Sequence, residues 1–315
     1  MWRFWSTLSK ARPYFYTMEA PVITVLHKSD FYRIRDFKCN CTRCSTSDIE
    51  YNKTFCICFV RSGYFEYRIL DKKLDTHVGR ALISKPDFEH TTYHIDNQPD
   101  ICTVFDFNAR FYEGLKDVYG KENGWFFDNT NIKCVLVQTS PTIEYYHQSI
   151  VNTLLQHRVD SLLVDETVIK LVDAIMRHMG SVEVLQPVSE SVRKYHLNTV
   201  EKATQYILNH FQEDIGLQEL ADHCCVSVFH FARIFKAVMQ QSPYQYLTAI
   251  RMTHARTLLE TTPLQVKQIA GQSGFKSLEQ FSATYHRFFE TTPSRYRKNI
   301  LSGLGKHPFT QIIQP

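Results

Sequence analysis

The sequence of 315 residues contains no apolar run approaching the roughly 18 residues that a membrane-spanning helix needs. Its basic and aromatic beginning, with Trp2, Arg3 and Phe4, also lacks the continuous apolar segment of a secretion signal. We therefore expect a cytoplasmic protein with no membrane partner. Residues 1–17 are assigned no function, because Met18 is an alternative start; an amphipathic docking segment is the other interpretation of this stretch.

The cysteines do not form the pattern of a disulfide framework. There are nine, an odd number, and they are scattered over the chain, which favours free thiols in a reducing compartment. Disorder is excluded as well, because 43% of the residues are hydrophobic and 22% are charged, a composition that builds packed cores. The length exceeds the usual single domain of roughly 100–200 residues and favours two domains.

Apolar residues that alternate over about residues 30–110 predict several short strands, as in a small sandwich or barrel. Turns are expected at Ser62-Gly63, at Asp71–Lys73 and at Gly79. Helices are expected near 141–157 and 162–179. The broad apolar stripe of the second helix must be buried, either against the barrel or against a second copy of the chain, or both.

The sequence therefore predicts an α+β protein in three parts. Residues 18–180 form a β-barrel with packing helices, residues 181–192 form a linker, and residues 193–300 form an all-helical domain. Residues 193–298 carry 13 Lys+Arg against 8 Asp+Glu, so the positive excess of the chain lies in this last part. Such an excess favours a polyanionic partner.

The C-terminal part repeats itself at an offset of about 50 residues. Ala221 corresponds to Ala270, and Phe231 corresponds to Phe281, with one residue inserted at an expected turn between them. Each copy is predicted to be a short helix, a turn and a longer helix, and a helix over about 243–260 connects the copies. In the longer helices we expect burial of Phe231, Ile234, Phe235 and Val238, and of Phe281, Tyr285 and Phe288.

Helix starts are expected at Ser277 with Gln280, at Ser242-Pro243 and at Thr262-Pro263, because a hydroxyl cap followed by Gln or Pro is typical of such starts. The segments Leu220 to Ser227, His230 to Lys236 and Ile269 to Arg297 resemble the double helix-turn-helix domain of AraC/XylS-type regulators. The resemblance covers about a third of the chain. It implies a transcription regulator that binds double-stranded DNA by placing two recognition helices in successive major grooves.

The chemistry of each side chain indicates whether it is expected to contact a base or a phosphate of DNA. Arg233 suits a bidentate pair with guanine, while Val228 and Phe229 suit a thymine methyl group. Lys236, Arg287 and Arg297 suit phosphates, and Ser227 and Ser277 either cap their helices or bind phosphate. The full predicted interface is Ser227, Val228, Phe229, His230, Ala232, Arg233 and Lys236 in the first copy, and Ser277, Leu278, Glu279, Gln280, Ser282, Ala283, His286, Arg287 and Arg297 in the second.

The second copy departs from the family pattern. Ala283 stands where Arg is frequent, His286 where Lys is usual, and Glu279 puts a negative charge on the outward face. We therefore expect the first copy to discriminate sequence more strongly. In its turn Cys225 replaces the customary Gly, a residue suited to a left-handed backbone.

The strand-rich part resembles, by position and pattern, the cupin-like sensor domain that precedes such DNA-binding halves. The resemblance implies a small-molecule effector, a homodimer and, in an activator, contact with RNA polymerase. Candidate effector contacts are Arg33, Arg35, Tyr67, His90 and His94. The His-x-His motif with a following Glu of metal-binding cupins is absent, so an enzyme is disfavoured and no cofactor is expected.

A cysteine cluster leaves one alternative open. Cys39, Cys41 and Cys44 could together bind Zn²⁺ or a soft metal, with a fourth ligand from Cys56, Cys58 or Cys102. The competing interpretation is a set of buried or idle thiols. Three functions thus remain: a ligand-responsive regulator, which we favour, a metal- or thiol-responsive regulator, and a metalloenzyme with a DNA-binding appendage.

Overall fold

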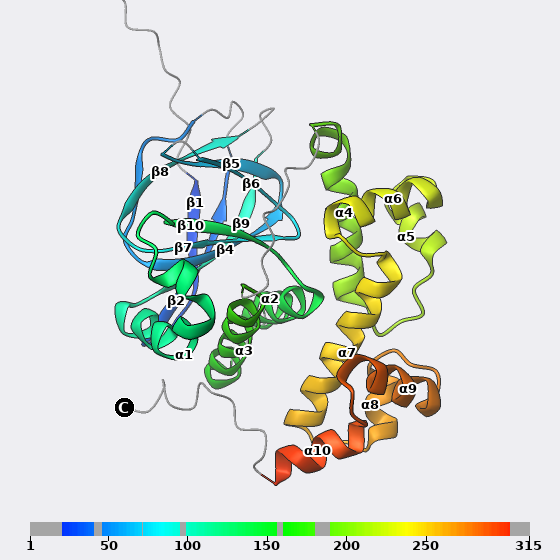
Figure 1. Ribbon diagram of the computed structural model, residues 1–315. Helices are drawn as coiled ribbons and strands as arrows, with labels where there is room; N and C mark the ends of the chain where they lie inside the picture. Colours follow the sequence, from blue (N-terminus) through cyan, green and yellow to red (C-terminus); the bar gives the residue numbers. More distant parts are fainter. Residues whose placement is uncertain are drawn as a thin grey trace, which may run out of the picture.

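The computed structural model describes residues 21–40, 46–70, 72–94, 99–155, 160–179 and 190–302 (Figure 1). Its first domain contains two antiparallel sheets. One has the order β1-β2-β9-β4-β7-β10: Val22–Lys28, Tyr32–Lys38, Ile101–Phe107, Phe55–Ser62, Arg80–Ser84 and Cys134–Gln138. The other has the order β3-β8-β5-β6: Glu50–Asn52, Phe88–His94, Tyr64–Ile69 and Lys72–His77.

The two sheets face each other across an apolar layer. Phe65 and Tyr67 from β5 meet Leu82 from β7 and Val104 from β9 in one buried cluster. The predicted turns at Gly63 and Gly79 are confirmed, because both glycines have positive φ, of 76° and 84°. The turn predicted at Asp71–Lys73 begins earlier: Leu70 takes the positive φ, and β6 has already begun at Lys72.

Three helices cover the outer face of the six-stranded sheet: α1 (Ala109–Phe127), α2 (Pro141–Leu154) and α3 (Ser161–Met179). The apolar stripe of α3, including Val168, Val172 and Ile175, is buried against this sheet and its neighbouring helices. It therefore covers the barrel, one of the two expected outcomes. Helix α1 and strand β10 were not predicted from the sequence.

The second domain is helical, as predicted. Its helices are α4 (Glu190–His210), α5 (Leu217–His223), α6 (Val228–Met239), α7 (Pro243–Thr261), α8 (Val266–Gln272), α9 (Leu278–Phe289) and α10 (Pro293–Leu301). Helix α4 begins inside the range expected as linker, of which residues 181–189 lie outside the described residues. Among the helices that the structure describes, none is both long and apolar enough to cross a membrane.

Several polar contacts join the two domains. Helix α2 packs on α7, where the hydroxyl of Tyr145 lies 2.8 Å from Nδ1 of His254. Lys170 of α3 lies 3.2 Å from the carboxylate of Glu260 on α7. At the other end of the interface, Glu201 of α4 accepts hydrogen bonds from the hydroxyl of Ser62 and the backbone N–H of Gly63, at 3.2 and 2.9 Å.

Candidate DNA interface and sensor cavity

The repeat seen in the sequence is a structural repeat. Cys225 and Gly274 occupy equivalent turns, and both have the left-handed backbone, with φ of 56° and 79°. Gln240 and Glu290, fifty positions apart, end α6 and α9 in the same conformation, with φ of 58° and 56°. Cys225, which replaces the customary Gly, thus adopts the same backbone that glycine adopts in the second copy.

The predicted helix starts are mostly confirmed. The hydroxyl of Ser227 accepts from the N–H of His230 at the start of α6, and that of Ser277 accepts from Gln280 at the start of α9. Ser242 caps α7 in the same way. The start expected at Thr262-Pro263 is wrong: Thr262 ends α7 with an extended backbone, and α8 begins only after Gln265. Proline disfavours helical geometry at the residue before it, which agrees with the end of α7 at Thr262. It does not explain the late start of α8, because Ser242-Pro243 has the same pattern and begins α7 directly.

Helix α7 connects the two copies as one continuous helix (Figure 1). Its Tyr246, Leu247 and Ile250 belong to the core of the first copy, whereas its Met252 and Leu259 belong to the core of the second. Because one helix contributes to both cores, it fixes the relative position of α6 and α9.

The buried face of α6 is the predicted one, since Phe231, Ile234, Phe235 and Val238 are all buried. In α9 the prediction holds for Phe281 and Tyr285 but is wrong for Phe288, which is 45% exposed. Phe289, next to it, packs into the core against Tyr285 instead, with ring centroids 4.6 Å apart. The two helices differ because the strand domain covers the end of α6. Val78 of the strand domain belongs to the same buried cluster as the apolar residues of α6.

The opposite faces of α6 and α9 are open to solvent. Phe229 is 90% exposed, and Arg233 and Lys236 are also exposed, which excludes a core role for this phenylalanine. Val228, His230 and Ala232 are half-buried, and Arg233 lies against His230 with Nη2 3.3 Å from Nδ1. On α9 the exposed residues are Ser277, Leu278, Glu279, Gln280, Ala283, His286 and Arg287, with Ser282 half-buried.

Arg297 and Glu279, both predicted to contact DNA, make hydrogen bonds within the protein. The guanidinium of Arg297 donates to the carbonyls of Leu259 and Leu264, at 3.5 and 2.5 Å, which argues against the predicted phosphate contact. At the tip of α9, hydrogen bonds from its own backbone N–H and from the hydroxyl of Ser277 lower the pKa of Glu279. This carboxylate therefore stays charged and suits the positive end of the helix.

A cavity of about 410 Å³ lies between the two sheets of the first domain. Four of the five predicted effector contacts, Arg35, Tyr67, His90 and His94, line it. The rings of Tyr67 and His90 stack at 4.5 Å, and burial lowers the pKa of His90. Arg33 does not line the cavity; its guanidinium lies 3.3 Å from Asp106.

Of the three predicted metal-binding cysteines, only Cys39 lies among the described residues. Cys41 and Cys44 lie outside the described residues, whereas Cys39 is buried at the cavity wall. Its sulfur lies 3.6 Å from Nδ1 of His94, and Nε2 of His94 lies 2.6 Å from Asp100. Asp100 was not predicted to join this cluster, because a lone carboxylate 61 positions from Cys39 gives no local signal.

Residues 220–299 match the family model of a helix-turn-helix domain. The C-terminal part of the chain thus contains a helix-turn-helix domain.

The similar proteins are named as regulators. The transcriptional regulator AlkR of Acinetobacter baylyi is 38% identical over 82 residues, which is 26% of this chain and 27% of AlkR. The melibiose operon regulatory protein of Escherichia coli is 30% identical over 111 residues, 33% of this chain and 37% of that protein. This chain thus aligns with about a third of the length of these relatives.

A solved structure of the DNA-binding domain of AdpA with its target DNA is 27% identical and covers 34% of this chain and 98% of that one, with a TM-score of 0.32.

Proposed function

We propose that the protein is a cytoplasmic, sequence-specific transcription regulator that inserts α6 and α9 into successive major grooves of double-stranded DNA. One observation carries the proposal: two equivalent, capped helices keep one face buried and one face exposed, and the single helix α7 supports both. A helix fits the major groove, and groove openings on one side of the duplex recur about every 34 Å.

The first copy is the stronger candidate for reading bases. Arg233 projects from the exposed face of α6 and can donate two hydrogen bonds to one guanine, worth roughly 1–3 kcal/mol of discrimination. Phe229, at 90% exposure, presents a ring that can contact a thymine methyl group. Lys236 and Arg287 are exposed cations suited to phosphates.

The first domain is proposed to sense a signal. Its cavity of about 410 Å³, with a polar and aromatic lining, is of a size that accommodates a small molecule. A homodimer and contact with RNA polymerase complete the proposal for an activator, although they rest on the resemblance alone. The naming of the similar proteins as regulators favours this function over a metalloenzyme with a DNA-binding appendage.

A selection from random duplexes tests the proposal. The full-length protein is incubated with a randomised DNA pool, and the bound sequences are compared with the input. We expect enrichment of one motif. Arg233→Ala should then weaken binding to that motif by about tenfold to a hundredfold, while binding to random DNA changes little. Lys236→Ala should weaken both and reduce the salt dependence of binding.

The matched control is Lys121→Ala, which removes an exposed charge from α1 of the first domain and should leave DNA binding unchanged. Equal losses of Arg233→Ala on selected and random DNA would contradict base recognition. Failure of the wild-type protein to enrich any motif would contradict the function itself.

A further inference from the structure

Three side chains with metal-binding atoms meet at one end of the cavity. Cys39 follows β2, His94 ends β8, and Asp100 precedes β9. One ligand atom from each lies within 4.8 Å of the other two, and all three side chains are buried. The cluster therefore joins the six-stranded sheet, through β2 and β9, to the four-stranded sheet, through β8.

The chemistry of these ligands selects a class of metal. A thiolate, an imidazole and a carboxylate suit Zn²⁺ and related transition metals, whereas Ca²⁺ and Mg²⁺ prefer oxygen ligands alone. Ligand atoms of tetrahedral Zn²⁺ lie about 2.0–2.3 Å from the ion. The sulfur of Cys39 faces Nδ1 of His94 at 3.6 Å, whereas Asp100 faces Nε2 at 2.6 Å. Binding one ion through a single ring nitrogen therefore requires His94, or one of the other two side chains, to turn toward the shared position.

Three protein ligands leave the fourth position of a tetrahedral metal open. Because Cys39, His94 and Asp100 all line the cavity, that position faces the space proposed for an effector. A water molecule or an anionic effector can occupy it.

The cluster lies next to the segment that holds the DNA-binding domain. Gly63 packs so closely on the chain at Asp100 that an added Cβ would lie 2.2 Å from the carbonyl of Pro99 and 2.9 Å from Cα of Asp100. The backbone N–H of the same glycine donates to Glu201 of α4 at 2.9 Å. Gly63 therefore contacts both the chain at Asp100 and Glu201 of α4.

Helix α4 in turn packs on α5 and α6 of the first helix-turn-helix unit through a shared apolar cluster, to which two further contacts are added. The thiol of Cys224, in the turn after α5, donates to the carbonyl of Thr199 at 3.4 Å. The ring of His196 lies 4.9 Å from the ring of His230 on α6. The cluster and the proposed recognition helix are thus connected by packed and hydrogen-bonded residues without a gap.

We propose that Cys39, His94 and Asp100 bind one Zn²⁺-class ion and that its binding shifts α4, and with it α6, through Gly63 and Glu201. The first half of the proposal, metal binding, stands by itself, and the second half, the shift of α4 and α6, rests on the proposed function. The two halves are tested separately.

Metal binding is measured on the full-length protein after removal of metals with a chelator. Titration with Co²⁺ should give one equivalent bound, with the charge-transfer band of a thiolate ligand and the visible bands of tetrahedral cobalt, and Zn²⁺ should displace it. Cys39→Ser and His94→Ala should weaken binding by more than about 100-fold, beyond the loss typical of an outer-sphere change. Cys134→Ser, a half-buried thiol on β10 outside the cluster, is the matched control and should bind normally.

The cobalt spectrum identifies a thiolate ligand in the wild-type protein, so the test does not depend on the folding of a variant. Absence of the charge-transfer band, or equal binding by Cys39→Ser and the wild type, would overturn the metal site.

Coupling is measured as the affinity for the selected DNA with and without Zn²⁺. The wild type should change by about fivefold or more, within the usual range of coupling between sites. Glu201→Ala should bind the metal normally but lose this change, while Lys202→Ala, an exposed neighbour on α4, should retain it. Metal binding without any change in DNA affinity would overturn the coupling. Failure to bind DNA under any condition would refute the proposed function and leave the metal titration decisive for the site.

Discussion

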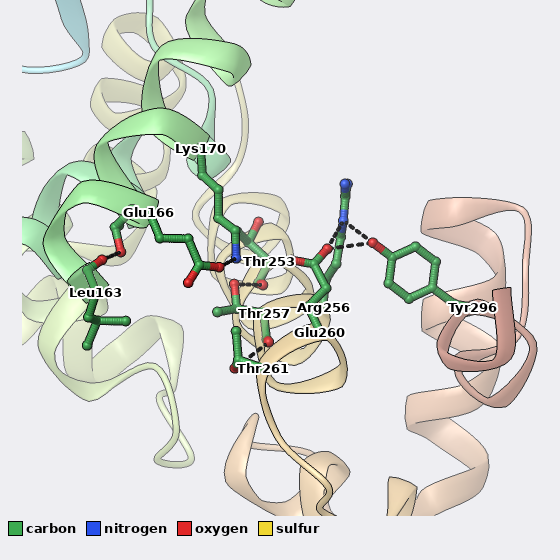
Figure 2. Close-up of polar contacts among 10 residues, drawn as sticks. Leu163, Glu166, Lys170, Thr253, Arg256, Thr257, Glu260, Thr261 and Tyr296 are labelled. Atoms are coloured by element: carbon green, nitrogen blue, oxygen red, sulfur yellow. Dashed lines mark hydrogen bonds and ion pairs between the residues drawn. The ribbon is translucent and has the colours of Figure 1, made fainter. Parts of the chain in front are cut away.

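The ion pair between Lys170 of α3 and Glu260 of α7 allows a quantitative prediction of the free energy of unfolding. Figure 2 shows Lys170 of α3 directed at Glu260 of α7, which also accepts a hydrogen bond from Tyr296 of α10 at 2.5 Å and lies 3.2 Å from Arg256. Burial acts to raise the pKa of Glu260, but the Tyr296 hydroxyl and the two cations together hold it below its usual value. The carboxylate is therefore charged and linked to both domains.

The magnitude of the Lys170–Glu260 interaction follows from its burial. The two side chains are only 11% and 15% exposed, so the pair is more than a surface ion pair. Removing one partner of a fully buried pair costs about 3–5 kcal/mol, and an exposed pair contributes about 0–1 kcal/mol. Because Arg256 and Tyr296 still compensate Glu260, we expect Lys170→Met to cost about 1–3 kcal/mol.

The assay is a double-mutant cycle in urea unfolding, with Lys170→Met, Glu260→Gln and the combined variant. The coupling free energy should be about 1–2 kcal/mol. Hydrogen exchange should also speed up in α3 and α7 of the Lys170 variant. Glu166→Gln is the control: this partner of Lys170 is 48% exposed, so its loss should cost less than about 1 kcal/mol. A coupling of zero would refute the view that this pair holds the domains together.

Three further changes test the core, the turns and the pH dependence. Phe281→Ala removes a fully buried ring and should cost about 3–5 kcal/mol in unfolding experiments, whereas Phe288→Ala, next to a ring that packs inward, should cost less than about 1 kcal/mol. Gly274→Ala should lower the melting temperature, because its Cβ would lie 2.7 Å from a backbone oxygen at positive φ, and Cys225→Gly at the equivalent turn should be tolerated. Burial raises the pKa of Glu201 to about 7, so this carboxyl binds a proton more tightly in the folded protein than in the unfolded chain. The stability that the protonated carboxyl contributes is fully present below about pH 4.5, and it is lost as the pH rises through 7. The unfolding free energy of the wild type minus that of Glu201→Gln should therefore fall by roughly 2–3 kcal/mol between pH 4.5 and 8, and a flat difference would be the opposite result.

The helical domain was predictable because its signals are local. Hydroxyl caps and the helical spacing of aromatic residues act within a few turns, and the 50-residue repeat shows the same signals twice. They predicted the span of α7 nearly to the residue, and the caps and most of the buried faces of α6 and α9. The error at Phe288 has a tertiary cause, since the sequence of α9 does not show that the strand domain covers α6 but not α9 at this position.

The strand domain was less predictable because its contacts are distant in sequence. Helix α1 was missed even though Phe111, Leu115 and Tyr119 recur at helical spacing on its buried face. The proposed metal cluster combines residues from three strand ends, so only the pairing of β2 with β9 and the facing of the two sheets bring Cys39, His94 and Asp100 together.

The most direct test of the central claim is a hydroxyl-radical footprint of the full-length protein on its selected DNA. Two helices held by α7 should protect two segments on one face of the duplex, one helical turn or about 10–10.5 base pairs apart. Arg233→Ala should remove base discrimination in one segment, and Ser282→Ala should affect only the other. A single protected segment, or two segments that respond equally to both variants, would contradict the account.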